Sequence, residues 1–151
     1  MFTITKSARN LSMALMAVGL ISLIFGFATD AHSSWPSLLF NNYFFLGISV
    51  FAVFFIALQY VSEAAWSIVL KRIPEAVISF LPITGLIMLI IMVSAAMHFG
   101  GNHIYHWMAD GIMDPESEHY DKIIAGKEAF LNTTFFLARS VLYILGWIYF
   151  G

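Results

Sequence analysis

The stretch Leu11–Thr29, LSMALMAVGLISLIFGFAT, contains no charged residue and consists mostly of apolar side chains. A helix that rises about 1.5 Å per residue over this stretch crosses a hydrocarbon core of about 30 Å. A secretory signal peptide is the alternative, because Lys6 and Arg9 precede the run. The run is long for a signal peptide and Ala28–Ala31 is a poor cleavage site, so we expect a retained membrane-spanning helix.

The composition of the whole chain agrees with a membrane location. Of its 151 residues, 60% are hydrophobic and 11% are charged, and the mean hydropathy is +0.84. A soluble domain of this length could not bury so much apolar surface. The absence of Cys excludes disulfides, cysteine-held iron–sulfur clusters and covalent haem attachment within this sequence. The net charge of −2 leaves no basic surface for nucleic acid.

Three further apolar spans follow, over residues 42–66, 76–98 and 134–150. Pro82 lies near the start of the third span, where its missing N–H frees the carbonyl of Ile78 and favours a kink. Asn132–Thr134 matches a glycosylation sequon, but a cap for the first turn of the last helix explains it better. We therefore predict an all-α integral membrane fold with four transmembrane helices in a single membrane domain, residues 1–151, and a loop over residues 99–133.

The positions of Lys and Arg predict the orientation in the membrane. Lys6 and Arg9 precede the first span. Lys71 and Arg72 follow the second, whereas residues 30–41 contain neither Lys nor Arg. Because basic residues are enriched on the cytoplasmic side, we expect a cytoplasmic N-terminus and an outer loop over residues 99–133. The fourth span ends without a basic anchor, so we expect the sequence to be a fragment of a longer chain.

Two carboxylates near the expected cytoplasmic side are candidates for a proton path. Glu63 follows Gln59 by four residues, and the two would form a polar edge on the second span. Its side chain could relay protons, or it could reach water or pair with nearby Lys71 or Arg72. Glu75, next to Pro74, has the same two interpretations at a shallower position.

Arg139 is a candidate near the outer end of the fourth span. Its guanidinium stays charged, so it needs a partner or a path to water. It could reach the outer headgroups, or it could pair with a carboxylate or a quinone-side group in the bundle. That partner could belong to a helix outside this sequence.

Histidines gather where the third span ends. His98, Asn102 and His106 recur every four residues, so a continuing helix would align them on one outer face, with His103 pointing away. This spacing fits neither a haem pair nor a zinc motif, and we expect no metal site. His98 is a candidate protonatable group, and His103, His106 and Trp107 are candidates for a partner interface.

A series of short motifs carries a family resemblance. In chain order these are Gln59-Tyr60, Ala65-Trp66-Ser67, Arg72 before Pro74-Glu75, Met97-His98-Phe99, His103-Ile104-Tyr105-His106-Trp107-Met108, Asp114-Pro115, Ile123-Ile124-Ala125-Gly126-Lys127, Leu131-Asn132, Phe135-Phe136 and Arg139. From the second span onward the chain resembles the ActF membrane subunits of bacterial alternative complex III, which are related to NrfD and polysulfide-reductase membrane proteins. The first span matches in character alone.

The resemblance implies a subunit of a quinol:cytochrome c oxidoreductase in the bacterial inner membrane, with the long loop in the periplasm. Such a subunit would be structural, with a possible proton-conducting role, within a larger NrfD-like bundle of about ten helices. Haem c and iron–sulfur clusters would lie on partner subunits, with quinol in the complex and no cofactor bound by this chain. The partners would be an NrfD-like paralogue, an iron–sulfur protein and c-type cytochromes.

Two other functions compete with this interpretation. The chain could be a small stand-alone membrane protein, either half of a transporter or an assembly factor. It could also be a haem b protein with histidine ligands, although the histidine spacing favours this least. We expect it to be non-catalytic by itself.

Overall fold

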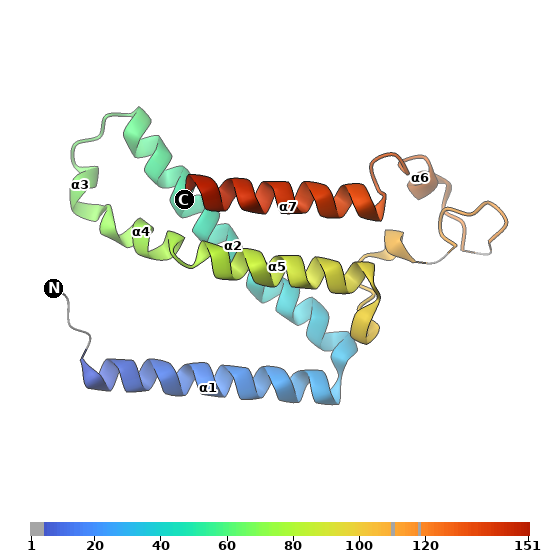
Figure 1. The fold of residues 1–151 in the computed structure, drawn as a ribbon, viewed down its shortest axis with the longest axis horizontal. Coiled ribbons are helices and arrows are strands. Elements are labelled where there is room, and N and C mark those ends of the chain that lie inside the picture. Colours follow the sequence, from blue (N-terminus) through green and yellow to red (C-terminus); the bar gives the residue numbers. More distant parts are fainter. Residues whose placement is uncertain (1–4, 110, 118) are drawn as a thin grey trace.

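The computed structural model describes residues 5–109, 111–117 and 119–151. Within these ranges the chain is all-helical, with 76% helix and no strand. Among the described residues, four segments are long and apolar enough to cross a membrane, namely Lys6–Thr29, Ala31–Val61, Arg72–Ala96 and Thr133–Phe150. The predicted all-α fold, with four helices long and apolar enough to cross a membrane, is therefore confirmed. The arrangement is compatible with a multi-pass membrane protein (Figure 1).

The first two helices follow each other almost without interruption. Helix α1 (Lys6–Thr29) ends at Asp30, which caps α2 (Ala31–Val61) by accepting a hydrogen bond from the Ser33 N–H at 3.2 Å. Hydrogen bonds from Ser33 also lower the pKa of the Asp30 carboxyl. We expected the second span to begin at residue 42, but it begins at Ala31 because this cap satisfies a free N–H of its first turn.

A bent connection joins α2 to the third span. Helix α2 ends at Val61, five residues before the predicted end at residue 66. Two short helices follow, α3 (Ser67–Leu70) and α4 (Arg72–Ile78), and α5 (Leu81–Ala96) continues after a break at residues 79–80. Pro82 lies in the first turn of α5, where its missing N–H costs nothing. The predicted kink before Pro82 is confirmed.

The core lies between α2, α5 and α7 (Thr133–Phe150). Leu46, Leu81, Met88 and Ile144 form its buried cluster. Gly85 allows α5 and α7 to approach closely, because a Cβ at this position would lie 2.8 Å from Ile144 Cγ2. Helix α7 begins at the predicted cap, where the Asn132 side chain accepts a hydrogen bond from the Phe135 N–H at 2.7 Å.

Two polar contacts connect α2 to the third span inside this core. The amide of Asn42 donates to the Thr84 carbonyl at 3.0 Å, and the hydroxyl of Ser49 lies 3.4 Å from the Val77 carbonyl. The side chains of Asn42 and Ser49 are both buried. In an apolar environment such contacts favour one helix register, since a slipped helix would leave the polar group without a partner.

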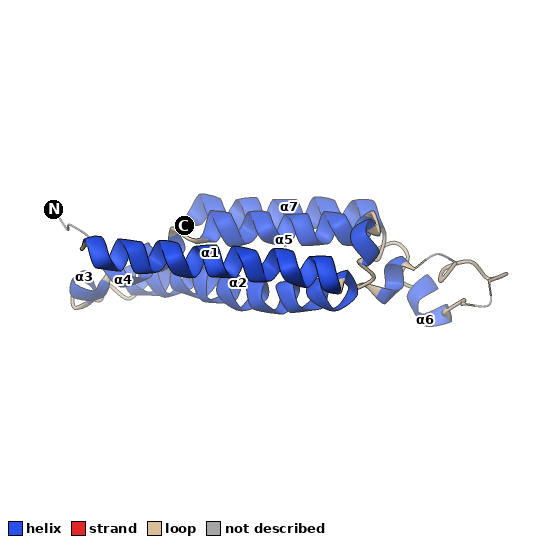
Figure 2. Ribbon diagram, turned by 90° about the horizontal axis from the view of Figure 1, so that it is seen from below, coloured by secondary structure: helices blue, strands red, loops and turns tan. Residues whose placement is uncertain are grey.

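The long helices extend along the molecule, and the connection between α5 and α7 projects from one end (Figures 1 and 2). This connection contains 3-10 turns at Phe99–Gly101 and His106–Met108 and the short helix α6 (Lys122–Ala125). The start of α1, the α3–α4 connection and the end of α7 lie at the opposite end (Figure 1). Helix α1 buries none of its residues and stands apart from α5 and α7.

Candidate functional site

A cavity of about 240 Å³ lies where α2 turns back through α3 into α4. Its lining combines apolar and polar side chains: Phe55, Ile56, Gln59, Tyr60, Ser67, Ile68, Lys71 and Pro74. A second cavity of about 440 Å³ lies against Ile56, Tyr60 and Lys71 and extends to the end of α7 at Phe150 and Gly151. Tyr60 and Lys71 therefore border both cavities.

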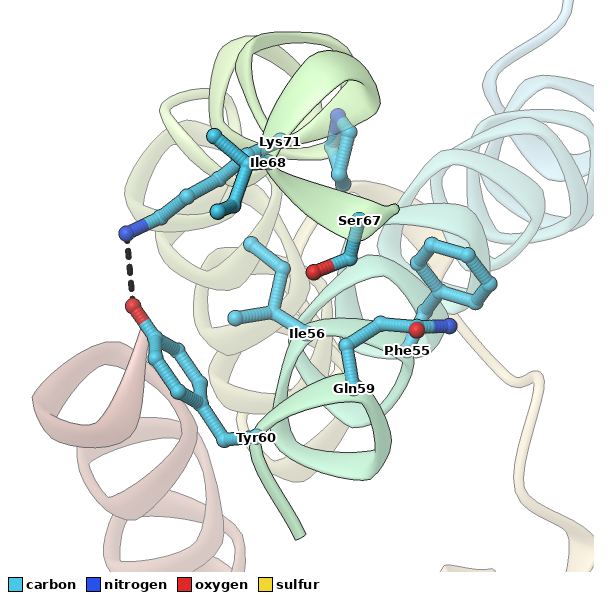
Figure 3. A pocket seen from close by; sticks show the side chains of 8 residues that line it. Phe55, Ile56, Gln59, Tyr60, Ser67, Ile68 and Lys71 are labelled. Atoms are coloured by element: carbon cyan, nitrogen blue, oxygen red, sulfur yellow. Dashed lines mark hydrogen bonds between the residues drawn. The ribbon is translucent and has the colours of Figure 1, made fainter. Parts of the chain in front are cut away.

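Lys71 is the central polar residue of this site. Its Nζ donates a hydrogen bond to the Tyr60 hydroxyl at 2.5 Å and lies 5.1 Å from the centre of the Tyr60 ring (Figure 3). On the other side, Nζ forms an ion pair with Glu75 Oε1 at 3.5 Å. The hydrogen bond to Tyr60, followed by the attraction of Glu75, raises the pKa of Lys71 above 10.5. The ammonium group therefore stays charged at neutral pH.

The two predicted proton-path carboxylates at this end have different surroundings. Glu75 is the partner of Lys71, and half of its side chain is exposed. Glu63 lies in the turn after α2 with a left-handed backbone, φ 48°, and is exposed. The helix ends before Glu63, so the expected helical edge with Gln59 does not form; Gln59 instead lines the cavity. Lys71, an expected partner of Glu63, pairs with Glu75.

The histidines at the far end do not continue the α5 helix. Helix α5 ends at Ala96, and His98 adopts a left-handed conformation with φ 51°. This turn redirects the chain and brings the ring of His103 to 5.1 Å from that of His98. The expected alignment of His98 with His106, and of His103 away from them, is therefore wrong. The sequence did contain a signal for this turn, because Gly100-Gly101 follows His98 and both glycines adopt positive φ, 61° and 71°.

Asn102 holds this end of the molecule together. It is completely buried and donates from Nδ2 to Ser94 Oγ at 2.6 Å and to the Ile91 carbonyl at 3.3 Å. Nearby, the Trp35 indole N–H donates to the Gly100 carbonyl at 3.1 Å. These contacts fasten the redirected chain to α5 and α2. The sequence pointed to Asn102 as part of a helical face, whereas it is an interior anchor.

The candidate interface residues differ in exposure. His103 and His106 are exposed. Trp107 is half-buried, and its ring packs against Phe136 of α7 with a centroid distance of 5.4 Å. Beside it, burial raises the pKa of Tyr105. The two histidines are therefore free to contact another surface, while Trp107 already stabilises the junction of the loop with α7.

Arg139 lies on α7 among aromatic rings. Its guanidinium carbon is 3.9 Å from the centre of the Phe130 ring and 5.3 Å from that of Phe135. One terminal nitrogen, Nη1, is buried and has no hydrogen-bond partner within the described part of the chain. Cation–π contacts compensate for some of the lost hydration, but a buried N–H without an acceptor costs free energy. The guanidinium is therefore held by aromatic packing within the chain.

The proton-path candidates lie at two opposite ends of the helices. Glu63 and Glu75 lie near the cavity, and His98 and Arg139 lie at the end with the long loop. Within residues 5–109, 111–117 and 119–151, no three His, Asp or Glu side chains form a group that could hold a metal ion.

No protein-family profile and no curated protein sequence matches this chain. The resemblance to alternative complex III subunits therefore depends on the short motifs alone.

The pairing of Tyr60 with Lys71 was not predicted. The two residues are 11 positions apart, and a turn of undetermined length separates them in the sequence. The sequence did contain a signal for the location of both residues. Tyr60 lies near the end of an apolar span and the basic pair Lys71-Arg72 follows, a pattern typical of a membrane interface. It indicated the depth of the residues but could not indicate their contact.

Proposed function

We propose that this chain is a multi-pass membrane subunit that supports a larger helical assembly in the bacterial inner membrane. In this proposal the assembly is a quinol:cytochrome c oxidoreductase of the alternative complex III type. An NrfD-like paralogue, an iron–sulfur protein and c-type cytochromes are the partners. The motif series supports the family, and the lack of Cys is consistent with iron–sulfur clusters and haem c on those partners.

One observation carries the scaffold role: a groove between α1 and α2, lined largely by small residues, that no described helix of the chain fills. The groove has a volume of about 640 Å³. Glycine, hydroxyl and amide side chains line much of it, including Gly19, Ser22, Gly26, Ser37 and Asn41. In membranes, small and polar residues are enriched where helices pack against helices, because they allow close approach and hydrogen bonds across the interface. The groove therefore favours a neighbouring helix over lipid.

Another surface of α2, farther along the helix, provides a contrast. Phe40, Tyr43, Phe44, Ile48 and Phe51 surround Gly47 there, and nearly all of the surface is apolar. Large apolar side chains pack well against lipid tails and offer no hydrogen bonds to another helix. Helix α2 thus has one surface suited to lipid and one suited to a protein partner.

In the proposed orientation, the start of α1 and the α3–α4 connection face the cytoplasm. Lys6, Arg9, Lys71 and Arg72 belong to this end, in agreement with the enrichment of basic residues on the cytoplasmic side. The loop between α5 and α7 would then lie in the periplasm, where exposed His103 and His106 could contact partner subunits.

A glycine substitution in the groove tests the scaffold role. At Gly19 a Cβ would have no neighbour within 4 Å, so the leucine of Gly19→Leu has open space at its base and occupies part of the groove. Gly47→Leu is the matched control, since Gly47 also has open space but lies on the aromatic side. We expect tagged wild type and Gly47→Leu to co-purify with haem c and iron–sulfur subunits from native membranes, and Gly19→Leu to lose them.

Purification of the wild-type chain as a free homo-oligomer, without haem or iron–sulfur subunits, would overturn the proposal. It would favour a stand-alone transporter half or an assembly factor.

A proton-conducting role has less support than the scaffold role. No Asp, Glu or His lies within residues 76–97 or 133–150, so side-chain carboxylates do not link the two ends through these helices. Proton transfer by Glu63 would therefore be confined to the entrance of a path that partner subunits complete. If so, Glu63→Gln should reduce proton coupling of the assembled complex while subunit composition stays normal. Unchanged coupling would remove Glu63 from the path.

A further inference from the structure

We propose that the cavity at Tyr60 and Lys71 binds the phosphate of an anionic phospholipid, with the lipid's hydrocarbon against the apolar part of the lining. This inference rests on the proposed membrane location of the chain. It adds a ligand site that the scaffold role does not require.

The hydrogen-bonding capacity of the pair supports a phosphate ligand. A lysine ammonium has three N–H donors. Tyr60 and Glu75 account for two of them, and no other described residue accepts the third. The Tyr60 hydroxyl accepts from Lys71 and keeps its own O–H to donate. Two donors whose heavy atoms lie 2.5 Å apart thus border one cavity (Figure 3), an arrangement that suits the oxygens of one anionic group.

The local charge favours an anion. Lys71 is the charged residue in the lining of the cavity, whereas Glu63 and Glu75 balance the charges of Lys71 and Arg72 over the turn as a whole. The raised pKa of Lys71 keeps its contribution positive throughout the physiological range. Basic pockets beside transmembrane helices on the cytoplasmic side attract anionic lipid headgroups, and this pocket lies at the end of the molecule that we place there.

The rest of the lining is suited to hydrocarbon. Phe55, Ile56, Ile68 and Pro74 supply apolar surface beside the two donors. A free phosphate would use the donors and leave this surface in contact with water, whereas a phospholipid would cover both. The exposed fractions of Tyr60 (65%) and Ile68 (75%) show that the cavity lies at the surface of the helices. A lipid could therefore enter it from the side.

Native mass spectrometry of the protein, purified in detergent from its own membranes, tests the site. The probes are phosphatidylglycerol, phosphatidylcholine and inorganic phosphate, added separately. We expect selective retention of phosphatidylglycerol. Lys71→Met and Tyr60→Phe should each weaken its binding by about tenfold, because each removes a donor to an anionic group.

Two control variants match these changes. Lys122→Met removes an exposed positive charge from α6, and Tyr43→Phe removes an exposed hydroxyl from the aromatic side of α2. Both should bind phosphatidylglycerol as the wild type does. Circular dichroism checks that each variant keeps its helix content, and Lys71→Arg, which retains charge and donors, should restore most of the binding.

Three results would overturn the lipid site. They are equal retention of phosphatidylcholine, equal loss of binding in the control variants, and displacement of the lipid by millimolar inorganic phosphate, which would identify free phosphate as the ligand. Failure of the membrane proposal is distinguishable, because the chain would then be released from membranes by alkaline carbonate. A carbonate-resistant chain without selective lipid binding would refute the lipid site alone.

Discussion

Replacement of Asn102 by Ala should release the chain that follows α5. Asn102 is completely buried, and its side-chain amide donates to Ser94 Oγ and to the Ile91 carbonyl at 2.6 and 3.3 Å. A buried hydrogen bond contributes about 1 kcal/mol net, so the loss of two should lower the local stability of this segment by about 2 kcal/mol. The Ser94 hydroxyl would also lose a partner inside the protein, which adds to the cost.

Amide hydrogen exchange of the purified protein in detergent measures this local stability. Since about 1.4 kcal/mol corresponds to a tenfold change in an equilibrium, amides of residues 102–108 should exchange about 30-fold faster in Asn102→Ala. Asn102→Asp keeps the shape and removes both donors, so it should give at least the same effect. Asn41→Ala is the control, because Asn41 is exposed and donates to the Ser37 carbonyl of its own helix. Equal exchange in Asn102→Ala and Asn41→Ala would refute the reasoning.

Three further predictions concern packing, protonation and orientation. Gly85→Ala should destabilise the protein by about 1–3 kcal/mol because the added methyl would overlap Ile144. Gly146→Ala, with no neighbour within 4 Å, should leave the melting temperature in detergent unchanged. Equal melting temperatures of the two variants would contradict the α5–α7 contact. Tyr60→Phe should lower the pKa of Lys71 toward 10.5, since the hydrogen bond to Tyr60 is the main cause that raises it. In the wild type the Lys71–Tyr60 contact should persist at neutral pH and weaken as the pH rises through the raised pKa. NMR of 13C-methylated lysines measures this pKa, and an unchanged value in Tyr60→Phe would contradict the Lys71–Tyr60 contact. Because the sequence has no Cys, a membrane-impermeant maleimide should label Glu128→Cys in intact spheroplasts and Ser62→Cys only after lysis; the reverse pattern would invert the proposed orientation.

The number and type of the long helices were predictable because the apolar runs are long and uncharged. The boundaries were less predictable. Residues 30–41 lie between the first two predicted spans, but the Asp30 cap starts a helix there. At the other end of α2, the positive φ of Glu63 marks the turn that follows the helix. In both cases a local backbone geometry determined the boundary, and average hydropathy does not report it.

The site was predicted less completely than the fold. Glu75 was identified as a candidate, but Lys71 was considered only as one possible partner of Glu63. The i, i+4 spacing of Lys71 and Glu75 does predict a pair once residues 72–78 are known to be helical. His98 and His103 lie together because the chain reverses after α5, and no periodic pattern signals such a reversal.

The sequence alone determined the number of long apolar helices and one class of chemistry that the chain excludes. The uncharged spans are long and apolar enough to cross a membrane, and without Cys the chain cannot hold a thiolate-bound cofactor. The tertiary structure decided which polar groups meet: Lys71 with Tyr60, Asn102 with Ser94, and Arg139 with two aromatic rings. These contacts depend on where helices stop and turn. Hydropathy is an average over many residues. It therefore indicates how deep in a membrane a side chain would lie, but it does not indicate which side chains are its neighbours.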